Sequence, residues 1–417
     1  MSQQQLRPVA TVMAIGIFGT TFVQLQGLGY LPFCNLLMKH MGLNSDTAAT
    51  FFSLSILPWS FKFIAGLLVD GVPIFGSRRR TYLLLSALTA SALWLLMGFV
   101  PGNYNLLLAL AIAMNTALVF ASTTSGGLLV EAGQKFGVSG NLSSLRVFAQ
   151  NLGAALGLPV GGLLAAHALG WTSAAAILPM MGIFFAAWFL LREPAPARVV
   201  APERSFGESI IGITLSILWQ IKNVLRRQMW WPAVLIFFIQ VVPTFRSTCF
   251  YQYQTKTLNY TDAELGWLGL VGYGVALLSS GAYAWICRKI PLRASLYGAI
   301  FVTGLSALPY LFYTSSMPRA MAIEGAGTFL QYLAYLPLFD LVVRACPKGS
   351  EALGYSVLIG VWNLGLMFGT KTGPMLYDHG LNKNMNSLIW LNAGVTLAGI
   401  IFVVLLPKAL VEKREGK

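Results

Sequence analysis

The chain has 417 residues, of which 56% are hydrophobic and only 10% are charged, whereas an ordinary soluble domain has about a quarter of its residues charged. This composition excludes a conventional water-soluble fold and, with 42 glycines and 12% aromatic residues, favours helices that pack closely in lipid. The formal net charge of +14 does not indicate a nucleic-acid partner, because the longest basic run is Arg78, Arg79 and Arg80 and the other basic residues are dispersed.

Twelve stretches of the chain are long and apolar enough to cross a bilayer core, which takes about 20 helical residues at a rise of 1.5 Å each. In chain order they are predicted at 10–34, 47–69, 81–100, 105–130, 144–167, 171–191, 230–254, 263–287, 293–313, 319–345, 352–371 and 386–407. The first stretch exceeds the apolar part of a signal peptide and lacks a cleavage site, so we expect it to be retained. We therefore predict an all-α membrane protein with twelve transmembrane helices.

The basic residues divide unequally between the two sides of this arrangement. Of the 28 lysines and arginines, 21 fall on the side of the two termini and five on the opposite side. The remaining two, Lys62 and Arg246, fall inside predicted spans. Positive charge accumulates on the cytoplasmic side of membrane proteins, so both termini are predicted to be cytoplasmic.

A long polar stretch, 192–229, separates residues 1–191 from residues 230–417. It opens with a proline-rich run and continues with apolar residues spaced three or four apart. These residues are Ile211, Leu215, Leu218, Ile221 and Leu225. Their spacing predicts a linker helix that lies along the cytoplasmic membrane surface. Two six-helix halves with such a linker form the layout of the major facilitator fold, in which substrate binds near the midplane between the halves.

The predicted second span ends in a group of charged and flexible residues. Asp70 closes the span, and a turn through Gly76 leads to the basic run Arg78, Arg79 and Arg80. An acid and a basic cluster at one helix end can reach neighbouring helix ends, so we interpret these residues as a gating latch. The alternative is that the arginines only keep the loop inside the cell.

The same region resembles the folate-biopterin transporter family, and the resemblance extends into both halves. The segments that carry it are 57–66, 70–83, 243–244, 250–251, 258–260, 346–352 and 363–365. The resemblance implies a secondary transporter of the major facilitator fold that moves folates or pterins by alternating access. We further expect a monomer in the cell inner membrane. One departure concerns the fourth span, where members of the family commonly carry an acid. This chain has an acid-free stretch, 122–127, and reaches an acid only at Glu131. Any role of that acid in binding substrate or protons has therefore either moved elsewhere or been lost here.

Ionisable residues inside a membrane are costly and are therefore candidates for function. Arg246 follows Pro243 and Thr244 in the seventh span, where a proline frees a backbone carbonyl and lets the helix bend. Folates and many pterin derivatives carry carboxylates, for which a guanidinium is a two-pronged donor. We expect Arg246 to anchor the substrate anion; the alternative is an internal ion pair with an acid such as Glu324.

The tenth span carries Glu324, Thr328, Gln331 and Tyr335 at steps of four, three and four, which places them on one helix face. We expect this polar face to line the central cavity, with Glu324 as the carboxylate that couples transport to protons. The alternative places Glu324 at the periplasmic mouth, where water solvates it. Farther along, Asp340 and Arg344 are four residues apart and are predicted to pair within the helix.

The remaining candidates for substrate binding are neutral or singly charged groups in other spans. They are Lys62, Gln150, Thr244, Tyr251 and Asn363. The four cysteines lack metal-ligand spacing, and the enzyme motifs HExxH, GxSxG and Walker A are missing from the sequence. We therefore expect neither an enzyme nor a bound cofactor. The competing functional hypothesis is a facilitator permease for another bulky metabolite, such as a siderophore or a muropeptide.

Overall fold

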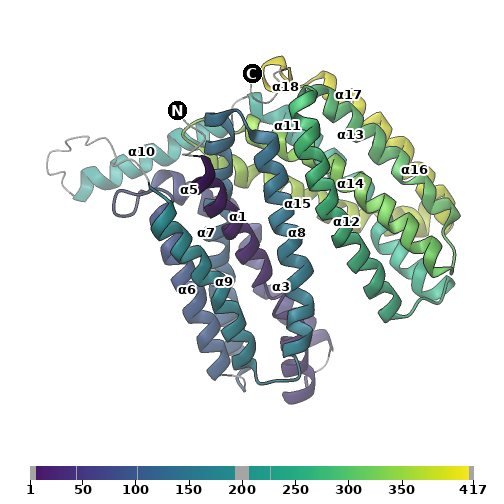
Figure 1. Cartoon of the computed structure of the whole chain (residues 1–417), viewed down its shortest axis with the longest axis horizontal. Coiled ribbons are helices and arrows are strands. Elements are labelled where there is room, and N and C mark those ends of the chain that lie inside the picture. Colours follow the sequence, from purple (N-terminus) through teal and green to yellow (C-terminus); the bar gives the residue numbers. More distant parts are fainter. Residues whose placement is uncertain (1–5, 44, 101, 193–205, 226, 413–417) are drawn as a thin grey trace. The chain divides into compact units, whose positions relative to one another are not determined.

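The computed structural model describes residues 6–43, 45–100, 102–192, 206–225 and 227–412, and these residues are almost entirely helical (Figure 1). In the first part of the chain the α-helices are α1 Leu6–Phe22, α2 Tyr30–Cys34, α3 Ser45–Ser55, α4 Leu57–Ser60, α5 Lys62–Gly71, α6 Arg80–Phe99, α7 Tyr104–Phe136, α8 Ser139–Leu164, α9 Leu169–Leu190 and α10 Phe206–Val224. They continue as α11 Arg227–Gln252, α12 Asp262–Lys289, α13 Leu292–Ser306, α14 Met317–Ala345, α15 Glu351–Met375, α16 Met385–Ala398, α17 Ile400–Val404 and α18 Lys408–Val411. Short π-helical or 3₁₀ turns follow α2, α11, α13 and α15.

Ten helices within the described ranges are long and apolar enough to cross a membrane. They match the third to twelfth predicted spans. The first two predicted spans are each divided into shorter helices: the chain turns between α1 and α2, and α3, α4 and α5 meet at single-residue breaks. Pro58 lies in the second of these regions, where its missing N–H weakens a continuous helix.

The chain forms two compact units. Unit 1 comprises Met1–Lys135, Ala149–Val224 and Cys346–Val357, and unit 2 comprises Phe136–Phe148, Leu225–Ala345 and Leu358–Lys417. The division predicted from the sequence, 1–191 and 230–417 with a linker, remains a prediction; Phe136–Phe148 belongs to unit 2 and Cys346–Val357 to unit 1. As a result, α15 starts in unit 1 and continues in unit 2.

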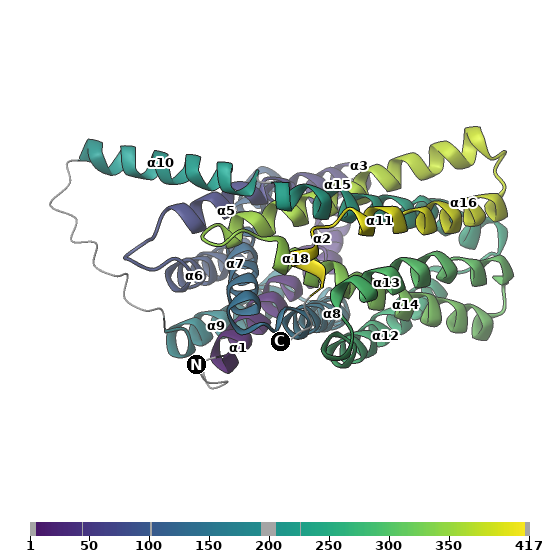
Figure 2. The same cartoon turned by 90° about the horizontal axis from the view of Figure 1, so that it is seen from above.

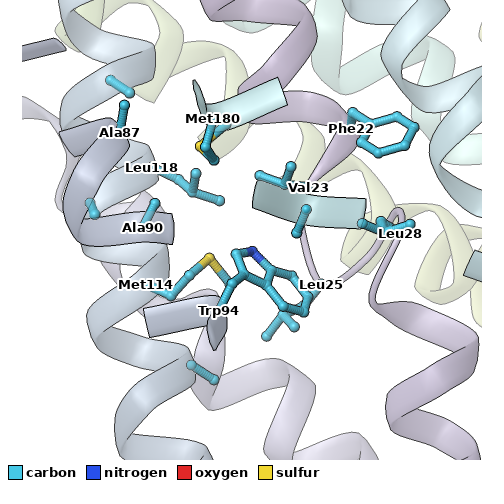
Figure 3. Packing of buried hydrophobic residues seen from close by; sticks show 14 of the residues in the cluster. Phe22, Val23, Leu25, Leu28, Ala87, Ala90, Trp94, Met114, Leu118 and Met180 are labelled. Atoms are coloured by element: carbon cyan, nitrogen blue, oxygen red, sulfur yellow. The ribbon is translucent and has the colours of Figure 1, made fainter. Parts of the chain in front are cut away.

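Large apolar side chains of α6, α7 and the turn after α1 form part of the core of unit 1. Trp94 of α6 is fully buried, and Figure 3 shows it with Met114 of α7 and with Leu25 from the turn after α1. Phe33 packs edge-on against Trp94 with ring centroids 6.1 Å apart, and it stacks on Phe51 of α3 at 5.5 Å. These contacts hold the broken first and second spans against continuous helices.

The core of unit 2 contains an aromatic cluster between α11 and the turn after α13. Phe250 of α11 packs edge-on against Tyr310 and Tyr313, with centroid separations of 5.1 and 4.8 Å. Tyr310 and Tyr313 stack on each other at 5.9 Å. This cluster places two phenol hydroxyl groups beside the polar residues of α14.

The linker contains the predicted amphipathic helix. It is α10, which lies alongside α5 and crosswise to α6 and α9 within unit 1 (Figures 1 and 2). Gln220 and Asn223 are buried, whereas Leu215, Leu218 and Trp219 are exposed. The helix therefore directs Gln220 and Asn223 toward the protein, together with Val224, and leaves about half or more of Leu215, Leu218 and Trp219 exposed.

Candidate functional site

Arg79 is the centre of a buried group of charges in unit 1. Its side chain is 2% exposed, and Nη2 lies 2.8 Å from Oδ1 of Asp70. Nε donates to Oε1 of Glu131 at 3.0 Å, and Glu351 lies 3.8 Å from Nη2. Burial acts to lower the pKa of Arg79, but Glu131 and Asp70 outweigh burial and raise this pKa above its ordinary value. Arg79 therefore stays charged and holds carboxylates that come from three helices.

The loop between α5 and α6 brings Arg79 back to Asp70. Ile74 and Ser77 exchange two backbone hydrogen bonds of 3.0 Å. Between them Phe75 and Gly76 have φ angles of 50° and 74°, which is the left-handed pair found in tight hairpin turns and favours glycine. Tyr82 donates its hydroxyl to the carbonyl groups of Leu68 and Val72, at 2.9 and 2.8 Å. The end of α5 and the start of α6 are thereby fastened together.

The first turn of α15 binds to the same cluster. Oδ2 of Asp70 accepts a hydrogen bond from the backbone N–H of Leu353 at 2.8 Å. The first N–H groups of a helix lack partners inside the helix, and the positive end of the helix dipole favours a carboxylate there. Glu351 in turn accepts from the N–H of Gly349 at 2.7 Å. Asp70 therefore joins Arg79 to the start of α15 with its two oxygens.

Three glycines let α15 approach α5 and α7 this closely. A Cβ at Gly66 would lie 2.8 Å from Cα of Leu353, and a Cβ at Gly127 would lie 2.8 Å from Cζ of Arg79. The ring of Tyr355 lies directly over Gly126. Side chains have no room at these places, so the three glycines form a surface without side chains beneath the first turns of α15. We call Gly66, Gly126 and Gly127 the glycine floor.

Replacing Gly126 by alanine should therefore loosen this packing. We expect Gly126→Ala to lower the free energy of unfolding by about 1–3 kcal/mol, because the new methyl group displaces the Tyr355 ring. Gly170→Ala is the matched control, since Gly170 has open space around its Cβ position. Denaturant unfolding of the purified protein in detergent measures both variants. Equal stability of the two variants would contradict the close approach of α15.

The structure separates the predicted latch residues into two groups. Asp70, Arg79 and Gly76 belong to the charge cluster or to its turn, as described above. Arg80 points elsewhere: it donates to the carbonyl of Trp188 at the end of α9 at 3.1 Å and lies over the Trp188 ring. Arg78 is exposed. The gating role of all these residues is taken up below as a proposal.

Lys62 is buried at the start of α5, and its Nζ donates to Oγ of Ser122 in α7 at 2.8 Å. The ammonium also lies 5.3 Å from the ring of Trp59 and 5.5 Å from the ring of Tyr355, which is within the range of cation–π attraction. Ser122 belongs to the acid-free stretch of the fourth predicted span. A hydroxyl group therefore contacts Lys62 from this stretch.

Arg246 and Glu324 both contact one tyrosine, Tyr310, in unit 2. The Arg246 guanidinium lies 3.4 Å from the centroid of the Tyr310 ring and 5.1 Å from that of Phe250. Tyr310 donates its hydroxyl to Oε2 of Glu324 at 2.7 Å. Among the described residues no ion pair joins Arg246 to Glu324. Nε of Arg246 is buried and has no hydrogen-bond partner within the described chain.

A second hydrogen-bond donor binds Glu324 from the π-helical turn Tyr253–Thr257 that follows α11. Nε2 of Gln254 donates to Oε1 of Glu324 at 3.3 Å and to the hydroxyl of Tyr313 at 2.8 Å. Glu324 is partly buried, and each of its oxygens has a donor from the protein. These two donors fix the position of the carboxyl group.

The rest of the predicted polar face on α14 forms a local contact. Gln331 donates to the hydroxyl of Tyr335 at 2.6 Å. Tyr335 packs edge-on against Trp362 of α15 at 4.8 Å, and Trp362 stacks on Phe339 at 4.9 Å. Gln331 and Tyr335 thus lie beside an aromatic row in unit 2. The predicted pair of Asp340 and Arg344 is confirmed at 2.8 Å.

The remaining candidates lie apart from these groups. Thr244 is buried and donates its hydroxyl to the carbonyl groups of Gln240 and Val241 in its own helix. Gln150 of unit 1 and Asn363 of unit 2 are exposed. The side chain of Tyr251 lies outside the described residues. None of these placements tests a role in substrate binding.

Comparison with known protein families decides the membership of the chain. The model of the BT1 family matches residues 25–417. The chain belongs to the BT1 family. Its relatives include the folate-biopterin transporter of Synechocystis, which is 29% identical over 94% of this chain and 81% of that protein. Folate transporter 1 of Plasmodium falciparum is 22% identical over 94% of this chain and 79% of that protein.

Solved structures show the same fold as this BT1 family member. The human organic anion transporter MFSD10 (TETRAN) superposes with a TM-score of 0.70, at 14% identity, over 97% of this chain and all of that chain. The proton:xylose symporter XylE superposes with a TM-score of 0.67, at 15% identity, over 98% of this chain and 97% of that chain. The resemblance and the major facilitator fold inferred from the sequence are thereby confirmed, and the chain is a multi-pass membrane transport protein.

Sequence reasoning about this BT1 protein missed several members of both groups. Glu131 and Glu351 bind Arg79, and Tyr310 and Gln254 bind Glu324, yet they were not singled out for these contacts. Glu351 had a signal, since it lies in a segment that carries the family resemblance. The others had none, because each meets its partner through a distant part of the chain.

Proposed function

We propose that this BT1 protein is a secondary transporter that moves folates, pterins or a related bulky organic anion by alternating access, coupled to protons. The names of its relatives support the substrate class, and the distribution of Lys and Arg supports an orientation with both termini in the cytoplasm. We place the protein in the bacterial inner membrane as part of the same proposal. The single observation that carries the mechanism is the arrangement of Arg246 and Glu324 around Tyr310.

Arg246 is suited to bind an anion. Its guanidinium lies over the ring of Tyr310, 3.4 Å from the ring centroid, and a guanidinium carries five N–H donors in a fork that matches a carboxylate. Nε is buried without a hydrogen-bond partner among the described residues, and such a donor is costly until an acceptor arrives. A substrate carboxylate supplies that acceptor. Tyr310 and Phe250 add aromatic surface for a flat ring system.

Glu324 is suited to couple this binding to protons. A substrate carboxylate at Arg246 and an ionised Glu324 repel each other across Tyr310, so protonation of Glu324 favours binding of the anion. By linkage, the bound anion favours the protonated form of Glu324 to the same degree. Substrate and proton therefore bind together and leave together, which is the requirement for symport.

The cluster around Arg79 is the proposed gate. Asp70 and Arg79 hold the first turn of α15, and release of this turn requires breaking the bond from Asp70 to Leu353. The turn through Gly76 and the basic residues Arg78 and Arg80 keep the loop in place beside α9. Substrate binding and gating thus use different groups of residues.

A binding screen on the purified protein tests the substrate class. Folate, biopterin, a siderophore and an anhydromuropeptide are compared by thermal shift and by uptake. We expect folate or biopterin to stabilise the protein, and Arg246→Ala to weaken that binding by about 10- to 100-fold, which is the value of a charge-assisted hydrogen bond. Arg319→Ala, at an exposed arginine of the same unit, should bind normally. If only the siderophore or only the muropeptide stabilises the protein, the folate and pterin assignment is wrong and that compound indicates the substrate class.

A further inference from the structure

We propose that Phe75 and the outward face of α10 form one contact surface for a membrane leaflet, with a preference for anionic phospholipid. On the topology predicted above this is the cytoplasmic leaflet. The contact itself does not depend on the proposed transport function.

The outward face of α10 is apolar in the part of the helix that is described. Leu215, Leu218 and Trp219 are 60%, 57% and 50% exposed. Burying a leucine side chain is worth about 1.5–3 kcal/mol, so water is an unfavourable surrounding for this face. Contiguous apolar surface of this kind marks a contact with a membrane or another protein.

The inward face fixes α10 beside the cluster around Arg79. Nδ2 of Asn223 donates to the carbonyl of Lys348 and to the hydroxyl of Ser350, at 3.1 and 3.2 Å. Gln220 packs on Gly71, where a Cβ would lie 2.7 Å from its Nε2. Gly71 follows Asp70, and Ser350 precedes Glu351. The helix therefore contacts the chain on both sides of the cluster and cannot rotate its apolar face inward without losing these bonds.

Phe75 provides the second half of the surface. It is 92% exposed and has a φ of 50°, a conformation that costs a residue with a Cβ on the order of 1 kcal/mol. A large apolar side chain that is both strained and exposed requires a compensating contact outside the chain. Its loop begins where α5 ends, and α10 packs on α5 (Figure 2).

The bilayer is the occupant that fits both features. The helices of unit 1 include apolar spans that place a membrane next to this surface. Lys222, on the outward side of α10, and Arg78, in the Phe75 loop, are exposed. A basic residue near an anionic leaflet contributes about 1 kcal/mol of attraction, and a long side chain reaches the phosphate level while its stem stays apolar. Apolar residues with flanking lysine or arginine are typical of helices in the membrane interface.

Fluorescent labels on the full chain in lipid nanodiscs test this surface. The variants Phe75→Cys and Leu218→Cys are labelled with an environment-sensitive dye. Gly102→Cys, in an exposed loop, is the matched control. The wild-type chain shows how much dye reacts with the native cysteines. We expect labels at 75 and 218 to be quenched several-fold more by spin-labelled lipid than by iodide, and the label at 102 to show the reverse.

The lipid preference has its own readout. Adding phosphatidylglycerol to phosphatidylcholine should shield the labels at 75 and 218 further from iodide, and Lys222→Gln should reduce that gain. Quenching of both labels by iodide and not by lipid would overturn the proposal. Shielding that appears only when cell extract is added would also overturn it, because the surface would then be a protein contact. These results are independent of whether folate binds.

Discussion

Replacing Arg79 by glutamine should lower the free energy of unfolding by about 3–5 kcal/mol, because it leaves the carboxylate of Asp70 buried without its ion-pair partner. Asp70 is 1% exposed and would keep only the hydrogen bond from the N–H of Leu353. Transport should fall with stability, since the first turn of α15 loses its anchor. Denaturant unfolding in detergent and uptake per unit of folded protein measure the two effects.

A second substitution separates the ion pair from the gate. The double variant Asp70→Asn with Arg79→Gln removes the buried charge on both sides, so most of the lost stability should return. Transport should not return to the same degree, because an amide binds the α15 terminus without the charge that the helix dipole favours. If Arg79→Gln alone unfolds like the wild type, the cluster is not a buried ion pair in the membrane-embedded protein.

Replacing Glu324 by glutamine should abolish proton-driven accumulation of substrate while exchange of labelled for unlabelled substrate continues. Glutamine keeps an oxygen that accepts from Tyr310, but it cannot take up a proton. The same substitution at Glu264 is the control, because that exposed carboxylate caps the start of α12 and glutamine serves at this position as well.

Uptake into proteoliposomes with an imposed pH gradient, and counterflow without one, give the two rates for Glu324→Gln. Accumulation that still follows the pH gradient in this variant would remove Glu324 from the coupling mechanism. Loss of both accumulation and counterflow would point to a role of the carboxylate in binding or folding instead.

Features set by local sequence were predictable. The ten continuous spans follow from runs of apolar residues, and α10 follows from its spacing of three and four. The pair of Asp340 and Arg344 forms within one helix turn. The breaks in the first two spans were not predicted, because hydropathy averages over a window and does not register the turn after Phe22 or the effect of Pro58.

For contacts between residues in different elements, the sequence indicated one residue of each contact but not its partner. Charge and position singled out Arg79, Arg246 and Glu324, since an ionised group in a membrane requires compensation. Their partners are neutral or lie far along the chain: Tyr310 and Gln254 resemble many other polar residues in spans, and Glu131 is 52 residues from Arg79. Only tertiary packing selects these partners.

The glycine floor under α15 has a kinetic consequence. Gly66 and Gly126 present backbone to the first turns of α15, so few side chains interlock there, and Ala352 with Val69 and Tyr82 forms the apolar contact of the first turn. The activation barrier for departure of that turn then arises chiefly from the few ionic and hydrogen bonds of Asp70, and little of it from friction between apolar side chains. On the proposed gating role, the rate of opening would depend largely on electrostatics, and a methyl group added at Gly126 would change that rate as well as the equilibrium.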